Sequence, residues 1–213
     1  MRGDAVTRMP AAERRAALAR AALAVVDRDG VHAATTRAIV AEASMPLSSF
    51  HYAVPSRDEL LRDVVELVVS DESDAALAGL LADAVDVEDA IRRTLTAYLE
   101  HVRFAPGREQ AMFELTQYAL RTPELSDLPA EQYARYHGTA EQLLTAAETH
   151  LGIRWAVPVE HLARLIVTIT DGVTLAWLAD RDDASARHTI DLATAALVGF
   201  AEPRTPTARQ ETT

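Results

Sequence analysis

Apolar residues recur at helical spacing along most of the chain. Within residues 11–29 they stand three or four positions apart and define one face of a helix: Leu18, Ala21, Ala22, Val25 and Val26. Gly30 follows, and glycine commonly ends a helix because it tolerates a left-handed backbone. The pattern predicts a first helix over residues 11–29.

Two shorter helical patterns follow, separated by a tight corner. Thr35 is a good N-cap for a helix whose apolar face carries Ile39 and Val40. The pattern breaks at residues 44–45, and Pro46 suits the first turn of the next helix because its missing N–H would be unpaired there. That helix is only about two turns long. Phe50 can point inward, while the neighbouring polar and aromatic side chains face outward.

A short helix with small hydroxyl side chains and an aromatic pair on its free face fits the major groove of DNA. Residues 35–52 therefore predict a helix-turn-helix unit. A longer helix begins after Ser56, which is a good N-cap, and it has two acidic residues, Asp58 and Glu59, in its first turn. Its buried face is expected to carry Leu60, Leu61, Val64, Val65 and Val68.

Further helices are expected beyond residue 72, with breaks near 83–88, 105–107, 122–129, 152–158 and 181–185. The last two, at about 158–179 and 185–201, are long and strongly apolar on more than one face. One chain cannot easily bury all of that surface, so a second copy is the natural cover, and two helices from each chain would form a four-helix interface. The alternative is a central helix buried within the monomer.

The fold class predicted is all-α. A helix-turn-helix domain is expected over residues 11–55, a helical dimerisation domain over 56–201, and a disordered tail over 202–213, which is polar and contains proline.

Composition narrows the classes further. The 213 residues are 49% hydrophobic and include no cysteine, which excludes a disulfide scaffold and any thiolate metal site. The N-terminus does not resemble a signal peptide, and no uninterrupted apolar stretch approaches the roughly twenty residues that span a bilayer. We therefore expect a soluble, cytoplasmic protein with no membrane partner.

The net charge of −11 is divided unevenly along the chain. Residues 1–57 hold eight arginines against five acids, a net of +3, and residues 58–213 carry the remaining −14. A weakly basic head on an acidic body would orient the head toward a polyanion. Ordinary fluctuation of surface charge is the alternative explanation.

The chain from about residue 14 to 67 resembles the DNA-binding domain of the tetracycline-repressor (TetR) family. The resemblance rests on RRAALARAALAVVDRDG, on TTRAIVAEA, and on SSFHYAVPSRDELL, in which an aromatic pair precedes a Pro-Ser-basic-acidic entry into the next helix. Three positions depart from the family pattern. Ser44 replaces a turn glycine, Leu47 stands where a lysine is common, and residues 53–54 replace a more aromatic pair. The loss of the lysine removes one expected phosphate contact.

The resemblance implies a homodimeric regulator, with two recognition helices meeting successive major grooves of a palindromic operator in double-stranded DNA. The side chains expected to contact DNA are Thr36, Arg37, Ser48, Ser49, His51, Tyr52 and Arg57. Arg37 can reach a guanine edge or a phosphate, and Arg57 with the N–H groups beside Ser56 would clamp a phosphate. Tyr52 could instead pack on the first helix.

The resemblance also implies an effector pocket enclosed by the body helices, for a small molecule whose class the sequence does not indicate. Aromatic and polar residues that could line it are Tyr98, His101, Phe104, Phe113, Gln117, Tyr118 and Trp177. For any single one of these residues, a place in the core is the competing interpretation.

Catalytic and metal sites are not expected. No two of the seven histidines stand four residues apart, and the chain has no HExxH, GxSxG, P-loop or dinucleotide-binding motif, so we expect neither an enzyme nor a cofactor. The function predicted is a ligand-responsive transcriptional regulator, more specifically a repressor that an effector releases. The alternative is an all-helical ligand- or protein-binding dimer whose head binds DNA weakly or no longer binds it.

Overall fold

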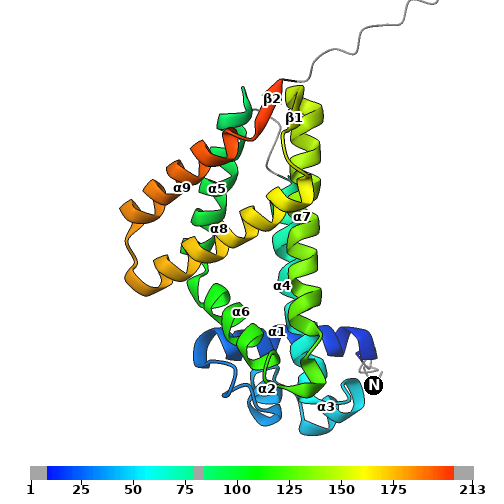
Figure 1. Cartoon of the computed structure of the whole chain (residues 1–213). Helices are drawn as coiled ribbons and strands as arrows, with labels where there is room; N and C mark the ends of the chain where they lie inside the picture. Colours follow the sequence, from blue (N-terminus) through cyan, green and yellow to red (C-terminus); the bar gives the residue numbers. More distant parts are fainter. Residues whose placement is uncertain (1–8, 79–83, 204–213) are drawn as a thin grey trace, which may run out of the picture. The chain divides into compact units, whose positions relative to one another are not determined.

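The computed structural model describes residues 9–78 and 84–203, and its side chains outside residues 71–83 (Figure 1). The elements follow in the order α1 (Ala11–Asp29), α2 (Thr36–Glu42), α3 (Leu47–Ala53), α4 (Arg57–Ala78), α5 (Val87–Phe104), α6 (Pro106–Ala119), the 3-10 turn η1 (Pro123–Leu125), α7 (Leu128–Leu151), β1 (Ile153–Trp155), α8 (Val159–Asp180), α9 (Asp183–Val198) and β2 (Ala201–Pro203). Apart from two short strands, the regular elements of the described residues are all helices, which confirms the predicted all-α class.

The predicted bounds of the first helix and the predicted N-cap of the second are confirmed. Helix α1 covers the expected residues and ends at Gly30, whose φ is +83°. The Thr35 hydroxyl accepts a hydrogen bond from the Ala38 N–H at 3.2 Å and caps α2. Pro46 lies one position earlier than expected, since it is the N-cap of α3 and not its first residue.

The corner between α2 and α3 is made with Ser44 in the left-handed conformation, at φ +53°. The Ser44 N–H donates to the Ala41 carbonyl at 3.0 Å, and the Met45 N–H donates to the Val40 carbonyl at 2.8 Å. This pair of bonds is the Schellman motif, which usually has glycine at this position. The serine therefore adopts the conformation that glycine would adopt more easily.

The described residues of 1–71 form one compact unit together with Ala105–Tyr133. In this first unit α1 packs against α2, α3 and α6. Its buried side chains come from helices far apart in the sequence, among them Leu18, Ile39, Phe50, Leu61 and Leu115. Helix α6 thus belongs to the same compact unit as the helix-turn-helix, although the sequence analysis assigned it to the body.

The described residues of 72–104 and 134–213 form the second unit. Here α9 packs against α5 and α8. The Tyr98 hydroxyl and the Thr174 hydroxyl lie 2.7 Å apart and join α5 to α8 by a hydrogen bond. Arg103 also joins α5 to the start of α9, through an ion pair with Asp183 at 2.7 Å.

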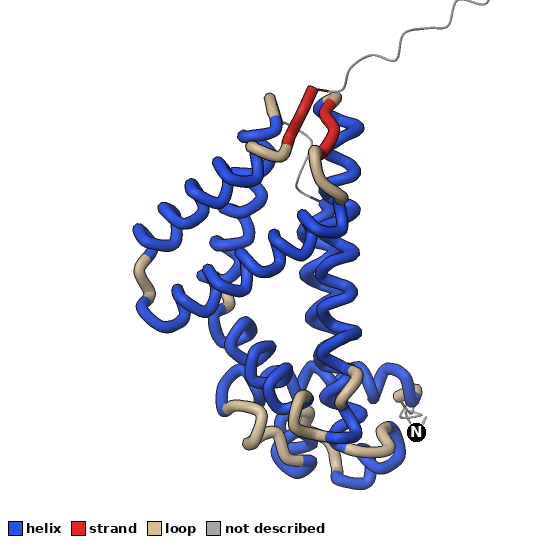
Figure 2. Tube along the Cα trace, viewed as in Figure 1, coloured by secondary structure: helices blue, strands red, loops and turns tan. Residues whose placement is uncertain are grey.

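A two-stranded antiparallel sheet pairs the residues that follow α7 with those that follow α9 (Figure 2). Strand β1 pairs with β2 so that Ile153 faces Pro203 and Trp155 faces Ala201. The buried Trp155 indole donates to the Leu144 carbonyl of α7 at 3.1 Å. Residues 202–203, placed in the disordered tail by the sequence analysis, therefore belong to a strand, and residues 204–213 lie outside the described part.

Helix α8 is long and strongly apolar. Its most apolar window has a mean hydropathy of 1.5, but only 33% of that window is buried in the single chain. By length and composition alone it could cross a membrane, although no uninterrupted apolar stretch suggested this. One such helix is weak evidence for a membrane span, because a helix covered by a second protein chain has the same properties.

Candidate functional site

Helix α3 is anchored by one buried side chain, and its other side chains are exposed or half-buried. Phe50 is buried at 2% exposure, whereas Ser48, His51 and Tyr52 are exposed and Ser49 is half-buried. At the start of α2, Arg37 is exposed and Thr36 is half-buried. All seven side chains predicted to contact DNA are therefore at least partly accessible, since Arg57, at the start of α4, is also half-buried.

Tyr52 interacts with the first helix but keeps most of its surface. The Arg14 guanidinium of α1 lies 5.3 Å from the centre of the Tyr52 ring, and the tyrosine remains 63% exposed. Arg14 was not singled out from the sequence, because only tertiary packing brings it beside α3. Its position adds a cation to the edge of the surface that α3 presents.

Arg57 differs from the other predicted contacts because its guanidinium points into the first unit. Its Nε donates to the Ala34 carbonyl at 2.7 Å, and its two terminal nitrogens donate to the Val31 carbonyl at 2.5 Å and to the Tyr118 hydroxyl at 2.9 Å. All three nitrogens are thus engaged within the unit. These bonds use three of the five guanidinium N–H groups, so a phosphate contact by Arg57, as the sequence predicts, would need a second N–H of one of the two terminal nitrogens.

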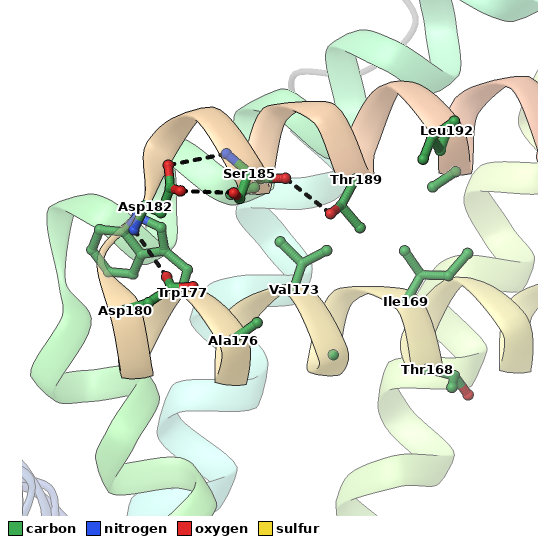
Figure 3. A pocket seen from close by; sticks show the side chains of 13 residues that line it. Thr168, Ile169, Val173, Ala176, Trp177, Asp180, Asp182, Ser185, Thr189 and Leu192 are labelled. Atoms are coloured by element: carbon green, nitrogen blue, oxygen red, sulfur yellow. Dashed lines mark hydrogen bonds between the residues drawn. The ribbon is translucent and has the colours of Figure 1, made fainter.

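A groove of about 460 Å³ lies between α8 and α9 (Figure 3). Its walls are mostly apolar and include Ile169, Val173 and Leu192. At one end Asp182 accepts hydrogen bonds from the Ser185 N–H at 3.1 Å and the Ser185 hydroxyl at 2.7 Å. These bonds lower the pKa of the Asp182 carboxyl, because they favour its ionised form, and they cap α9.

The side chains beside this groove leave an apolar face uncovered. Leu175 is 58% exposed on α8, and Leu192 is 60% exposed on α9. Small residues such as Gly172 and Ala176 lie near them on α8, where they permit close approach of another backbone.

The seven residues predicted to line an effector pocket fall into both units. Tyr98, His101, Phe104 and Trp177 belong to the second unit, whereas Phe113, Gln117 and Tyr118 lie on α6 in the first. Phe104 is 90% exposed and Gln117 is also exposed. The Tyr118 hydroxyl is engaged with Arg57 and donates to Asp58 at 3.2 Å. The structure therefore does not gather the seven into one site within either unit.

In the second unit, Trp177 already packs against a cation. The Arg181 guanidinium lies 4.5 Å from the centre of its ring, and its indole donates to Asp183 at 2.9 Å. His137 on α7 is half-buried, and burial together with the nearby Arg164 lowers the pKa of its imidazole. Among the side chains that the structure describes, no three His, Asp or Glu residues are placed to hold a metal ion.

Comparison with known proteins identifies similar chains over most of the length. Residues 87–201 match the family described as the C-terminal part of BetI-type transcriptional repressors. The HTH-type nicotine-responsive transcriptional repressor HdnoR of Paenarthrobacter nicotinovorans is 26% identical over 184 residues, which cover 86% of this chain and 93% of that protein.

Two solved structures have a similar fold. A TetR-family regulator from Mesorhizobium loti superposes with a TM-score of 0.74 at 16% identity, covering 91% of this chain and 99% of the other. A regulator from Saccharomonospora viridis, solved in complex with choline, gives a TM-score of 0.69 at 19% identity, with 90% and 99% of the two chains covered.

Proposed function

The chain is a TetR-family transcriptional repressor with a ligand-binding domain, and we propose that it acts as a homodimer that a small-molecule effector releases from a palindromic operator. The observation that carries the proposal is the surface of α3. Phe50 anchors the helix, while Ser48, His51 and Tyr52 stay exposed. Small and hydrogen-bonding side chains on a short helix suit entry into the major groove.

The homodimer is supported by the uncovered face of α8 and α9. Burying a leucine such as Leu175 or Leu192 against a partner would contribute about 1.5–3 kcal/mol relative to exposure. A two-fold axis doubles each such contact. Two heads related by that axis would meet half-sites about 34 Å apart, one turn of the DNA helix.

We propose that the effector is a small organic amine or ammonium compound. Two similar proteins support this class, since one is named as nicotine-responsive and the other was solved with choline. Aromatic faces attract such cations, and the second unit contains several aromatic rings, including Tyr98 and Trp177. The Arg181 side chain that covers Trp177 would compete for that ring.

The proposal is tested with the purified chain and DNA from upstream of its own gene. We expect tight binding that survives competitor DNA and protects a palindrome from cleavage. Nicotine and choline chloride are then added separately, and a compound of the proposed class should raise the melting temperature and weaken operator binding. If neither nicotine nor choline has either effect while operator binding is intact, the proposed effector class is contradicted but the proposed DNA-binding function is not.

The second candidate is a ligand-binding dimer that binds DNA weakly. It is favoured by Leu47, which leaves a 42% exposed leucine on α3 where a phosphate-binding lysine is common. Binding without sequence preference that disappears at moderate salt, followed by failure to select any site from random DNA, would establish this candidate in place of the first.

A further inference from the structure

The loop between α1 and α2 is held by side chains from two other helices of the first unit. Arg57, the first residue of α4, donates to the carbonyls of Val31 and Ala34. Glu114 of α6 accepts a hydrogen bond from the Val31 N–H at 3.0 Å. The loop leads directly into α2, so whatever fixes it also fixes the start of the helix-turn-helix.

Tyr118 of α6 holds the same arginine. Its hydroxyl accepts from Arg57 at 2.9 Å and donates to the Asp58 carboxylate at 3.2 Å. The guanidinium also lies 5.1 Å from the centre of the Tyr118 ring, and the His32 ring from the loop lies nearly perpendicular to that ring, with the two ring centres 6.2 Å apart. Arg57 is thus bound on one side by the loop and on the other by α6.

Helix α6 lies close to the end of α1 at two glycines. A Cβ added at Gly30, where φ is +83°, would lie 3.1 Å from a carboxylate oxygen of Glu114. A Cβ at Gly107, in the first turn of α6, would lie 1.8 Å from a carboxylate oxygen of Asp27 near the end of α1. Helix α6 therefore approaches the end of α1 at two places where only glycine fits without adjustment.

We propose that Arg57, Glu114 and Tyr118 form a latch through which α6 sets the position of α2 and α3 for DNA binding. Arg57 is then a positioning residue and not a phosphate contact. Only Ala105 separates α6 from α5 of the second unit, so the chain itself connects the latch to the ligand-binding part. This inference rests on the proposed DNA-binding function and adds how that function is regulated.

The test measures operator affinity of the full-length chain across a range of salt concentrations. Arg57→Ala should weaken binding about tenfold, as expected for loss of charge-assisted hydrogen bonds, with no change in the slope of log K against log salt. A lost phosphate contact would instead reduce that slope by about 0.9 per head. A reduced slope would overturn the positioning role.

Two further comparisons separate the latch from general destabilisation. Tyr118→Phe should weaken binding by itself, but add less than about twofold to Arg57→Ala, because the hydrogen bond that the Tyr118 hydroxyl accepts from Arg57 is already lost in that variant. Glu114→Gln keeps an acceptor for the Val31 N–H and should stay within about twofold of the wild type, whereas Glu114→Ala should lose about fivefold. The latch would be contradicted if the losses of operator affinity from Tyr118→Phe and Arg57→Ala multiplied in the double variant. It would also be contradicted if Glu114→Gln and Glu114→Ala lost the same affinity.

The control is Leu120→Ala, since Leu120 is exposed near the end of α6. It should leave affinity unchanged. Amide hydrogen exchange in the absence of DNA supplies an independent measurement: Tyr118→Phe should accelerate exchange at residues 31–53 and leave the second unit unchanged. Failure of the wild type to bind any operator would refute the proposed function, whereas unchanged exchange in Tyr118→Phe would refute the latch.

Discussion

Arg37 and Arg57 each stand near the start of a helix, but their side chains face different partners. Arg57 is engaged by the α1–α2 loop and Tyr118, whereas Arg37 is exposed on α2. We expect Arg37→Ala to weaken operator binding by about tenfold or more, the usual range for losing a base contact, without altering dimerisation. Filter binding and sedimentation of the same sample measure the two properties. Equal loss of both would refute a division of labour between head and body.

Ser44 offers a test of backbone strain at a single residue. A non-glycine residue in the left-handed region costs about 1–2 kcal/mol, and glycine would remove most of that cost while adding about 0.4–1 kcal/mol of unfolded-state entropy. Ser44→Gly is therefore expected to raise the free energy of unfolding by about 0.5 kcal/mol, measured by urea denaturation. Gly30→Ala is the opposite case, since its φ is +83° and Glu114 lies close, and it should destabilise. Destabilisation by Ser44→Gly would show that the corner is not strained.

At the scale of elements, the sequence predicted the features that depend on local signals and missed those that depend on tertiary contacts. Helix α1 and the caps at Thr35 and Ser56 follow from apolar spacing and hydroxyl side chains. Strands of three residues, separated by 45 residues of intervening chain, carry no periodicity, so β1 and β2 could not be predicted. The inward direction of Arg57 depends on Tyr118, 61 residues away, and no local pattern reports such a contact.

The dimer interface proposed for α8 and α9 can be tested with a single substitution. Leu192→Glu would place a carboxylate in the proposed dimer interface twice, once from each chain, and burial of unpaired charge is costly. We expect the dimer dissociation constant to rise about a hundredfold or more, with loss of operator binding, as measured by analytical ultracentrifugation and footprinting. Leu120→Glu is the matched control, because Leu120 is equally exposed at 60% but lies at the end of α6. A dimer unaffected by Leu192→Glu would place the interface elsewhere.

For the whole molecule, the charge distribution determines how DNA binding responds to salt. The arginines exceed the acids by only three in residues 1–57, and residues 58–213 carry a net −14. Since each neutralised phosphate contributes about −0.9 to the slope of log K against log salt, a head with few outward cations should give a shallow slope. The repressor would then depend on base contacts and on two-headed binding more than on general attraction to the DNA backbone.

Leu47→Lys tests this dependence and the dimer together. Leu47 is 42% exposed as the first residue of α3, where a lysine can reach a phosphate. One added phosphate contact should steepen the slope by about 0.9, and a two-headed complex doubles this to about 1.8. Leu120→Lys adds the same charge to the chain at an exposed site outside α3, so its slope should match that of the wild type. A steepening near 0.9 would mean that only one head engages DNA. An unchanged slope in Leu47→Lys would mean that the start of α3 does not face the phosphate backbone, and the proposed docking of the helix in the major groove would then be wrong.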